Sequence, residues 1–129
     1  MKLLKILKIQ NRMELKYFNK SEFTCKCGCG ETVISDDLLE MLDEARGFAK
    51  IPFVVNSGYR CVNHTESKRN PTSSHIKGLA VDIRCKDSRS RAIIIDALGY
   101  VGFTRLGIAK TFIHADIDKE KSNPVVWLY

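Results

Sequence analysis

The chain has 129 residues, 44% of them hydrophobic and 28% charged, which is the composition of one globular domain and excludes a disordered or collagen-like chain. Lysine and arginine outnumber aspartate and glutamate by 21 to 15, so the net charge is +6. Such an excess suits contact with polyanions, but the basic residues are not interleaved with aromatic ones, and a solvated basic surface is the simpler interpretation. We therefore expect no specific nucleic-acid binding.

The first segment of the chain, residues 1–16, is expected to be a tail or a short helix, followed by a single domain over 17–129. The opening letters MKLLKILKIQ are apolar, but Lys5 and Lys8 interrupt them. A secretory signal needs an unbroken apolar run, and a membrane span needs a longer one. We expect neither in this chain.

Two amphipathic helices are predicted. Apolar residues recur at helical spacing over 36–49, with Ser35 as a candidate N-cap, and Pro52 follows the end of that helix. The second helix spans about 88–101, and glycines mark its end. Residues 61–77 are polar and irregular, which predicts a long loop of the kind that often carries function.

Short apolar stretches predict the strands, which lie at residues 53–55, 79–84, 106–109, 111–117 and 125–128. Helices and strands do not alternate strictly, and the last strands follow each other closely. This order favours an α+β fold, with a small, mainly antiparallel sheet flanked by the two main helices.

Two histidine–aspartate pairs carry the candidate chemistry. His75 precedes Asp82 in SSHIKGLAVDI, and Gly78 between them allows the chain to bend from the loop into the strand. Asp82 lies in an apolar strand, where a carboxylate is costly unless a cation pairs with it. In TFIHADID, His114 and Asp116 share one strand face while the alternate residues form a core face.

Two histidines and one carboxylate are a common catalytic zinc set, which leaves a position open for water. Zinc lowers the pKa of that water toward neutrality, so that it can attack an amide carbonyl. On the residues alone, chance placement of the histidines competes with this interpretation.

Three motifs resemble the zinc D-Ala-D-Ala carboxypeptidase family, within the wider group of hedgehog-type and lysostaphin-like zinc peptidases. They are SGYR (57–60), S-x-H-x-x-G-x-A-x-D (73–82) and F-x-H-x-D (112–116). The resemblance covers about Phe23 to Asp118, and together with CKCGCG it is similar to small phage-encoded members. It implies the fold of that family and the hydrolysis of peptidoglycan stem peptides, either as a carboxypeptidase or as an endopeptidase.

The resemblance also implies residue roles. His75, Asp82 and His114 match the three zinc ligands. Arg60 matches the arginine that binds substrate and polarises the carbonyl, for which a planar, permanently charged guanidinium is suited; a salt bridge that holds the loop is its alternative role. Ser73 is a candidate for binding substrate or for holding the ligand loop.

The general base departs from the family pattern. Relatives place an acid or a histidine two or three residues before the last ligand, where this chain has Phe112 and Thr111. Asp116 is the nearest titratable replacement and our candidate base, although it could instead orient a ligating imidazole. His64 is assigned no chemistry.

The chain has five cysteines, so at least one thiol has no disulfide partner within the chain. They are Cys25, Cys27, Cys29, Cys61 and Cys85. The C-x-C-x-C spacing is tighter than the usual zinc knuckle, although four thiolates including Cys61 could hold a second, structural zinc ion. A disulfide from the 25–29 loop to Cys61 is the other option. We favour free or bridged cysteines over the second ion.

These inferences together predict a monomeric zinc peptidase whose partner is a peptidoglycan peptide. Without a signal peptide, we expect it to be cytoplasmic until released to the wall, as a phage lysis enzyme, or to be virion-associated. The alternative is a non-catalytic zinc-binding, structural or wall-binding module of the same fold, which the missing upstream base favours.

Overall fold

The computed structural model describes residues 14–129. Most of the tail predicted for 1–16 therefore lies outside the described residues. The helices are the 3₁₀ helix η1 (Lys20–Phe23), α2 (Asp36–Ala49), α3 (Thr65–Arg69) and α4 (Ser88–Tyr100). The strands are β1 (Val55–Ser57), β2 (Ala80–Arg84), β3 (Arg105–Ile108), β4 (Phe112–Asp116) and β5 (Val125–Leu128).

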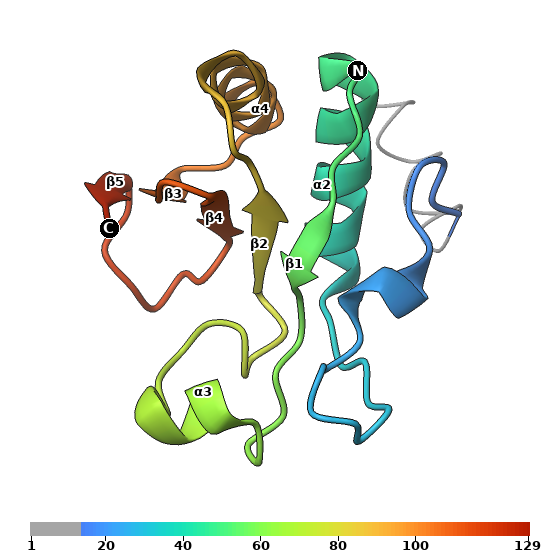
Figure 1. Ribbon diagram of the computed structural model, residues 1–129, viewed down its shortest axis with the longest axis vertical. Coiled ribbons are helices and arrows are strands. Elements are labelled where there is room, and N and C mark those ends of the chain that lie inside the picture. Colours follow the sequence, from blue (N-terminus) through green and yellow to red (C-terminus); the bar gives the residue numbers. More distant parts are fainter. Residues whose placement is uncertain (1–13) are drawn as a thin grey trace.

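The five strands form one sheet in the order β1-β2-β4-β3-β5 (Figure 1). Among the described residues, three of the four strand pairings are antiparallel, and the fourth, β3 with β5, is parallel. The predicted α+β fold with a mainly antiparallel sheet is thus confirmed. None of the helices within 14–129 has the length and apolar character that crossing a bilayer requires.

The core lies between α2, α4 and one face of the sheet. Val81 and Ile83 from β2 and Ile113 and Ala115 from β4 are all fully buried there. Helix α2 begins at the expected cap, since Ser35 accepts a hydrogen bond from the Leu38 N–H, and Asp87 caps α4 by accepting one from the Ser90 N–H. The core face predicted from alternation is correct.

The residues that alternate with this core face lie on the opposite side of the sheet, which we call the site face. Ala80 and Asp82 of β2 and His114 and Asp116 of β4 belong to it. In the antiparallel register Asp82 stands directly opposite His114, and Ala80 stands opposite Asp116. The sheet therefore brings the two halves of the sequence motif into contact.

Two predictions of local structure were wrong. The segment 61–77 is not irregular throughout, because it contains the five-residue helix α3, which His64 caps by accepting a hydrogen bond from the Glu66 N–H. A helix of little more than one turn is too short to show a periodic pattern. The first strand is Val55–Ser57 rather than 53–55, and Phe53 is a buried residue just before it.

Candidate metal centre and its surroundings

His75 reaches the site face from the loop that enters β2. Gly78 has a φ of +70°, and a Cβ at this position would lie 2.3 Å from the Val33 carbonyl oxygen, so the bend requires glycine. The Nδ1 atom of His75 lies 2.8 Å from the carbonyl oxygen of Gly58. Because a carbonyl only accepts, Nδ1 carries the proton and Nε2 presents its lone pair to the site.

His114 faces Asp82 with Nδ1, whereas His75 faces it with Nε2. Its Nε2 lies 2.6 Å from Oδ2 of Asp116, while its Nδ1 lies 3.0 Å from Oδ1 of Asp82. The Nε2 atom of His75 lies 3.3 Å from the same Asp82 oxygen. One nitrogen from each imidazole therefore faces a single carboxylate oxygen.

This geometry fits a divalent ion. Metal–ligand bonds of about 2.0–2.1 Å in a tetrahedron separate neighbouring ligand atoms by about 3.3–3.4 Å. The distances from Asp82 Oδ1 to the two imidazole nitrogens, 3.3 and 3.0 Å, are close to that value, and the ligand atoms of the three residues all lie within 4.8 Å of one another. All three side chains are buried, where converging lone pairs are costly unless a cation lies between them.

The charges of these groups are strongly coupled. Burial alone would raise the pKa of Asp82, but hydrogen bonds with His114 and His75 outweigh it and hold that pKa well below the ordinary range. Burial alone would lower the pKa of His114, but its contacts with Asp116 and Asp82 raise it. Asp82 is thus ionised at neutral pH.

Arg60 reaches the same carboxylate. Its Nη2 lies 3.2 Å from Asp82 Oδ2, and its Nε donates to the Ser57 hydroxyl at 2.9 Å. The backbone N–H of Arg60 donates to the carbonyl oxygen of His75 at 3.2 Å, which ties the SGYR segment to the loop that carries His75. Among residues 14–129, the Ser57 and Asp82 contacts use two of the five guanidinium donors, which leaves donors for a substrate.

Ser73 lies beside this group, in the loop that carries His75. It is buried, and its hydroxyl accepts a hydrogen bond from the backbone N–H of His75 at 3.2 Å. Of the two roles considered for Ser73, this contact supports holding the ligand loop.

Asp116 lies behind His114 in a buried network. Its side chain is 1% exposed, and Oδ1 accepts from Arg105 Nε at 2.7 Å and from the Asp118 N–H at 3.1 Å. Burial alone would raise the pKa of Asp116, but hydrogen bonds with His114 and Arg105 outweigh it and lower the pKa. Both carboxylate oxygens are therefore engaged, and the group is a weak proton acceptor.

A cavity of about 430 Å³ opens over the site, within the size range of small-ligand pockets. Sequence reasoning missed its aromatic wall, which comes from Trp127 and Tyr129 at the end of the chain. The Trp127 ring lies 5.3 Å from the His114 ring, and Gly107 pairs in register with both residues. A Cβ at Gly107 would lie 2.6 Å from the indole, so only glycine lets Trp127 lie across β3.

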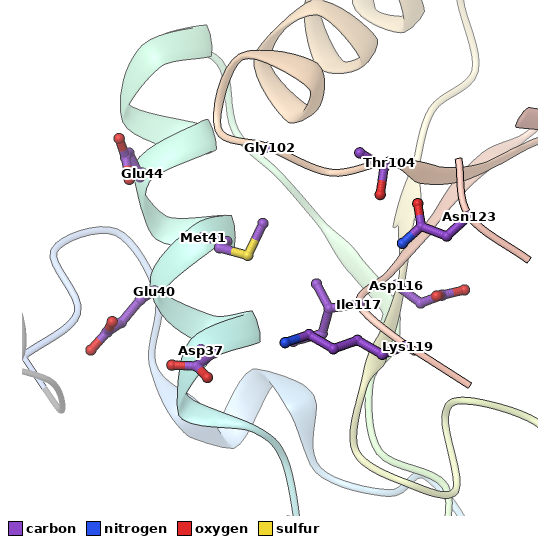
Figure 2. Close-up of a pocket in the computed structure, with 10 residues that line it drawn as sticks. All are labelled: Asp37, Glu40, Met41, Glu44, Gly102, Thr104, Asp116, Ile117, Lys119 and Asn123. Carbon is purple, nitrogen blue, oxygen red and sulfur yellow. The ribbon is translucent and has the colours of Figure 1, made fainter. Parts of the chain in front are cut away.

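A larger cavity of about 640 Å³ lies between α2 and the ends of β3 and β4 (Figure 2). Met41 and Ile117 form its apolar part, and Lys119 extends across it toward Asp37. Its lining includes Asp116 but neither histidine of the candidate metal centre. The chemistry therefore lies in the smaller cavity.

An α+β fold that brings His, Asp and His together beneath an open cavity, with an arginine beside them, has the features of a metallopeptidase. The family model described as Peptidase M15 matches residues 16–116. The chain belongs to this family of zinc D-Ala-D-Ala carboxypeptidase-like proteins, which confirms the resemblance noted in the sequence. A comparison with curated proteins gives no match.

Family membership supports a zinc peptidase that acts on peptidoglycan. The matched region contains all three candidate ligands and Arg60, and it ends before β5. The aromatic wall formed by Trp127 and Tyr129 therefore lies outside the matched part of the chain.

Proposed function

We propose that this protein hydrolyses peptidoglycan stem peptides with a zinc ion held by His75 Nε2, Asp82 Oδ1 and His114 Nδ1. The observation that carries the proposal is the convergence of two imidazole nitrogens on one carboxylate oxygen at 3.3 and 3.0 Å. When bound in such a site, zinc supplies Lewis acidity, which lowers the pKa of water and polarises a carbonyl.

The chain's own residues then bind and orient the reactants. Arg60 lies against Asp82 at the cavity, where its free donors suit a peptide carboxylate or the developing oxyanion. The hydrogen bonds from Nδ1 of His75 to Gly58 and from Nε2 of His114 to Asp116 hold the other nitrogen of each ring toward the metal position.

Asp116 was our candidate base, with orientation of an imidazole as its alternative role. Its burial and its two engaged oxygens support the alternative better, because a base must reach the proton of the attacking water. We therefore propose that Asp116 is a positioning residue that holds His114.

The aromatic wall suggests how a stem peptide is accommodated. Trp127 and Tyr129 offer apolar surface beside the two histidines, and Arg60 offers positive charge in the same cavity. A short peptide with a terminal or side-chain carboxylate suits this combination. We also propose a role in cell lysis, for which the net charge of +6 would favour contact with anionic wall polymers.

The test is digestion of purified peptidoglycan with and without a chelator, followed by mass spectrometry of the released fragments. Release of D-alanine identifies a carboxypeptidase, and new amino termini within the stem identify an endopeptidase. Whichever product is released should be absent in the presence of the chelator and with the His114→Ala variant. Intact stems after incubation with the zinc-loaded protein would contradict the proposal.

A second candidate is a non-catalytic module that binds zinc and wall peptide. Thr111 and Phe112 occupy the positions where relatives carry the base, and neither accepts a proton at neutral pH, which favours this candidate. Zinc-dependent binding of wall fragments without turnover would support it over the enzyme.

A further inference from the structure

A second group of metal-binding side chains lies outside the His/Asp/His site. The sulfur atoms of Cys25, Cys27, Cys29 and Cys61 all lie within 4.8 Å of one another. Cys27 Sγ lies 3.5 Å from Cys25 Sγ and 3.3 Å from Cys61 Sγ. Zinc–sulfur bonds of about 2.3 Å in a tetrahedron place neighbouring sulfur atoms about 3.8 Å apart, so these separations match a four-thiolate site.

The backbone of the loop from residue 25 to residue 31 brings its three cysteines together, with Cys25 buried and Cys27 and Cys29 exposed. The Cys25 N–H donates to the Glu31 carbonyl oxygen at 2.9 Å and closes the loop. Gly28 and Gly30, on either side of Cys29, have φ values of +96° and +77°, which other residues rarely adopt. This backbone allows the tight C-x-C-x-C spacing to present three sulfur atoms to one point.

Backbone donors also reach the sulfur atoms. The Cys61 N–H lies 3.3 Å from Cys25 Sγ, and the Glu31 N–H lies 3.4 Å from Cys29 Sγ. Such contacts stabilise negative charge on sulfur, as metal-bound thiolates need from their surroundings. Disulfide formation would use the sulfur atoms in pairs, whereas the structure gathers all four around one centre.

We propose that these four cysteines bind a structural zinc ion that fixes the Arg60 segment. A tetrahedral set of four sulfurs selects zinc among the common divalent ions, and each thiol releases its proton on binding. Cys61 follows Arg60 directly, and the Tyr59 N–H donates to the Phe23 carbonyl oxygen at 2.9 Å. The ion would thus hold the loop at residues 25–29 against the segment that presents Arg60 to Asp82.

The experiment is native mass spectrometry of the full chain, purified without oxygen and loaded with zinc. The wild type should hold two zinc ions per chain, and the double variant Cys27→Ser/Cys29→Ser should hold one. His114→Ala should also hold one, because it removes a ligand of the other site. Cys85→Ser is the matched control and should hold two, because Cys85 is buried in the main core, apart from the four cysteines.

Cobalt provides a readout that does not depend on a cysteine variant folding. His114→Ala loaded with cobalt(II) should show sulfur-to-cobalt charge-transfer absorption, since its four cysteines are intact. Absence of that absorption would overturn the proposal. So would two zinc ions retained in the double cysteine variant, or a wild-type mass lowered by the hydrogens lost in disulfide formation. Because the zinc count separates the two sites, failure here is distinguishable from failure of the peptidase proposal.

Discussion

Asp116 Oδ2 lies 2.6 Å from His114 Nε2, and this contact determines which nitrogen of the imidazole faces the candidate metal position. The same carboxylate pairs with Arg105, which itself stacks over the Trp127 ring at 5.1 Å. A continuous set of contacts thus links His114, the candidate metal ligand, with a buried ion pair and the aromatic wall of the cavity.

Asp116→Asn should weaken zinc binding and leave the chemical step largely intact. An amide holds the imidazole less strongly than a carboxylate, and loss of such a partner typically costs about 10–100-fold in metal affinity. We expect the zinc concentration that half-restores activity to chelator-treated protein to rise by this factor, while kcat at saturating zinc changes little.

Asp118→Asn is the matched control for that variant. Asp118 is as buried as Asp116, but its carboxylate contacts Ser74 and Lys77 rather than His114. Its zinc requirement should therefore equal that of the wild type. If Asp116→Asn instead loses kcat at saturating zinc with an unchanged zinc requirement, Asp116 is the general base.

Arg60→Ala should keep the zinc and lose turnover. Removal of a donor that stabilises transition-state charge typically costs about 10²–10³-fold in rate. Arg60→Lys should rescue only part of the loss, because an ammonium group cannot form the paired contacts of a guanidinium. The measurements are kcat/KM on a stem peptide and the zinc content of each variant.

Arg84→Ala serves as the control for Arg60, since Arg84 is exposed at the end of β2. Its kcat/KM should be unchanged. Equal activity of Arg60→Ala and the wild type would leave Arg60 with only the role of tying its loop to Asp82.

Gly78→Ala should destabilise the fold. A left-handed backbone costs a residue with a Cβ about 1–2 kcal/mol, and the overlap with the Val33 carbonyl adds to this. Gly99 offers a comparison, because it lies within α4 and an added Cβ there would meet nothing within 4 Å in residues 14–129 beyond its own helix backbone and chain neighbours. Gly99→Ala should stabilise the protein by about 0.5–1 kcal/mol.

Urea unfolding of the two glycine variants measures both effects. Gly78→Ala should also require more zinc for activity, since Gly78 leads the chain from His75 into β2. Equal stability of Gly78→Ala and the wild type would show that the bend does not depend on glycine.

Asp118 should contribute to acid sensitivity. Burial alone would raise the pKa of Asp118, but the Ser74 hydroxyl and the Lys77 ammonium outweigh it and lower the pKa. A lowered folded-state pKa means that the ionised group stabilises the protein above about pH 4, the ordinary aspartate pKa, and that this contribution is lost as the pH falls further.

The free energy of unfolding of the wild type should therefore decline more steeply below about pH 4 than that of Asp118→Asn. Denaturant titrations at several pH values give both curves. Parallel acid-range curves for the two proteins would contradict the role of Asp118.

Much of the fold could be predicted from the sequence because its elements are long or strictly alternating. Helices α2 and α4 follow from their apolar spacing, and the core faces of β2 and β4 follow from alternation. Helix α3 could not be predicted, since five residues show no period. The bounds of β1 were also missed, because Phe53 is buried like a strand residue although it precedes the strand.

For the site, the sequence supplied the candidate ligands but not their arrangement. The register that sets Asp82 opposite His114 depends on how β2 pairs with β4, and one residue of slip would place the two side chains on opposite faces. The pairing of Arg105 with Asp116 depends on the register of β3. Trp127 enters the site only because β5 lies parallel to β3, which no local pattern indicates.

The central claim is that His75, Asp82 and His114 hold a zinc ion, and a crystal structure with anomalous diffraction at the zinc edge tests it most directly. The expected result is an anomalous peak within bonding distance of His75 Nε2, Asp82 Oδ1 and His114 Nδ1. Zinc-loaded crystals with no peak at that position, and with both imidazoles turned away from Asp82, would contradict it.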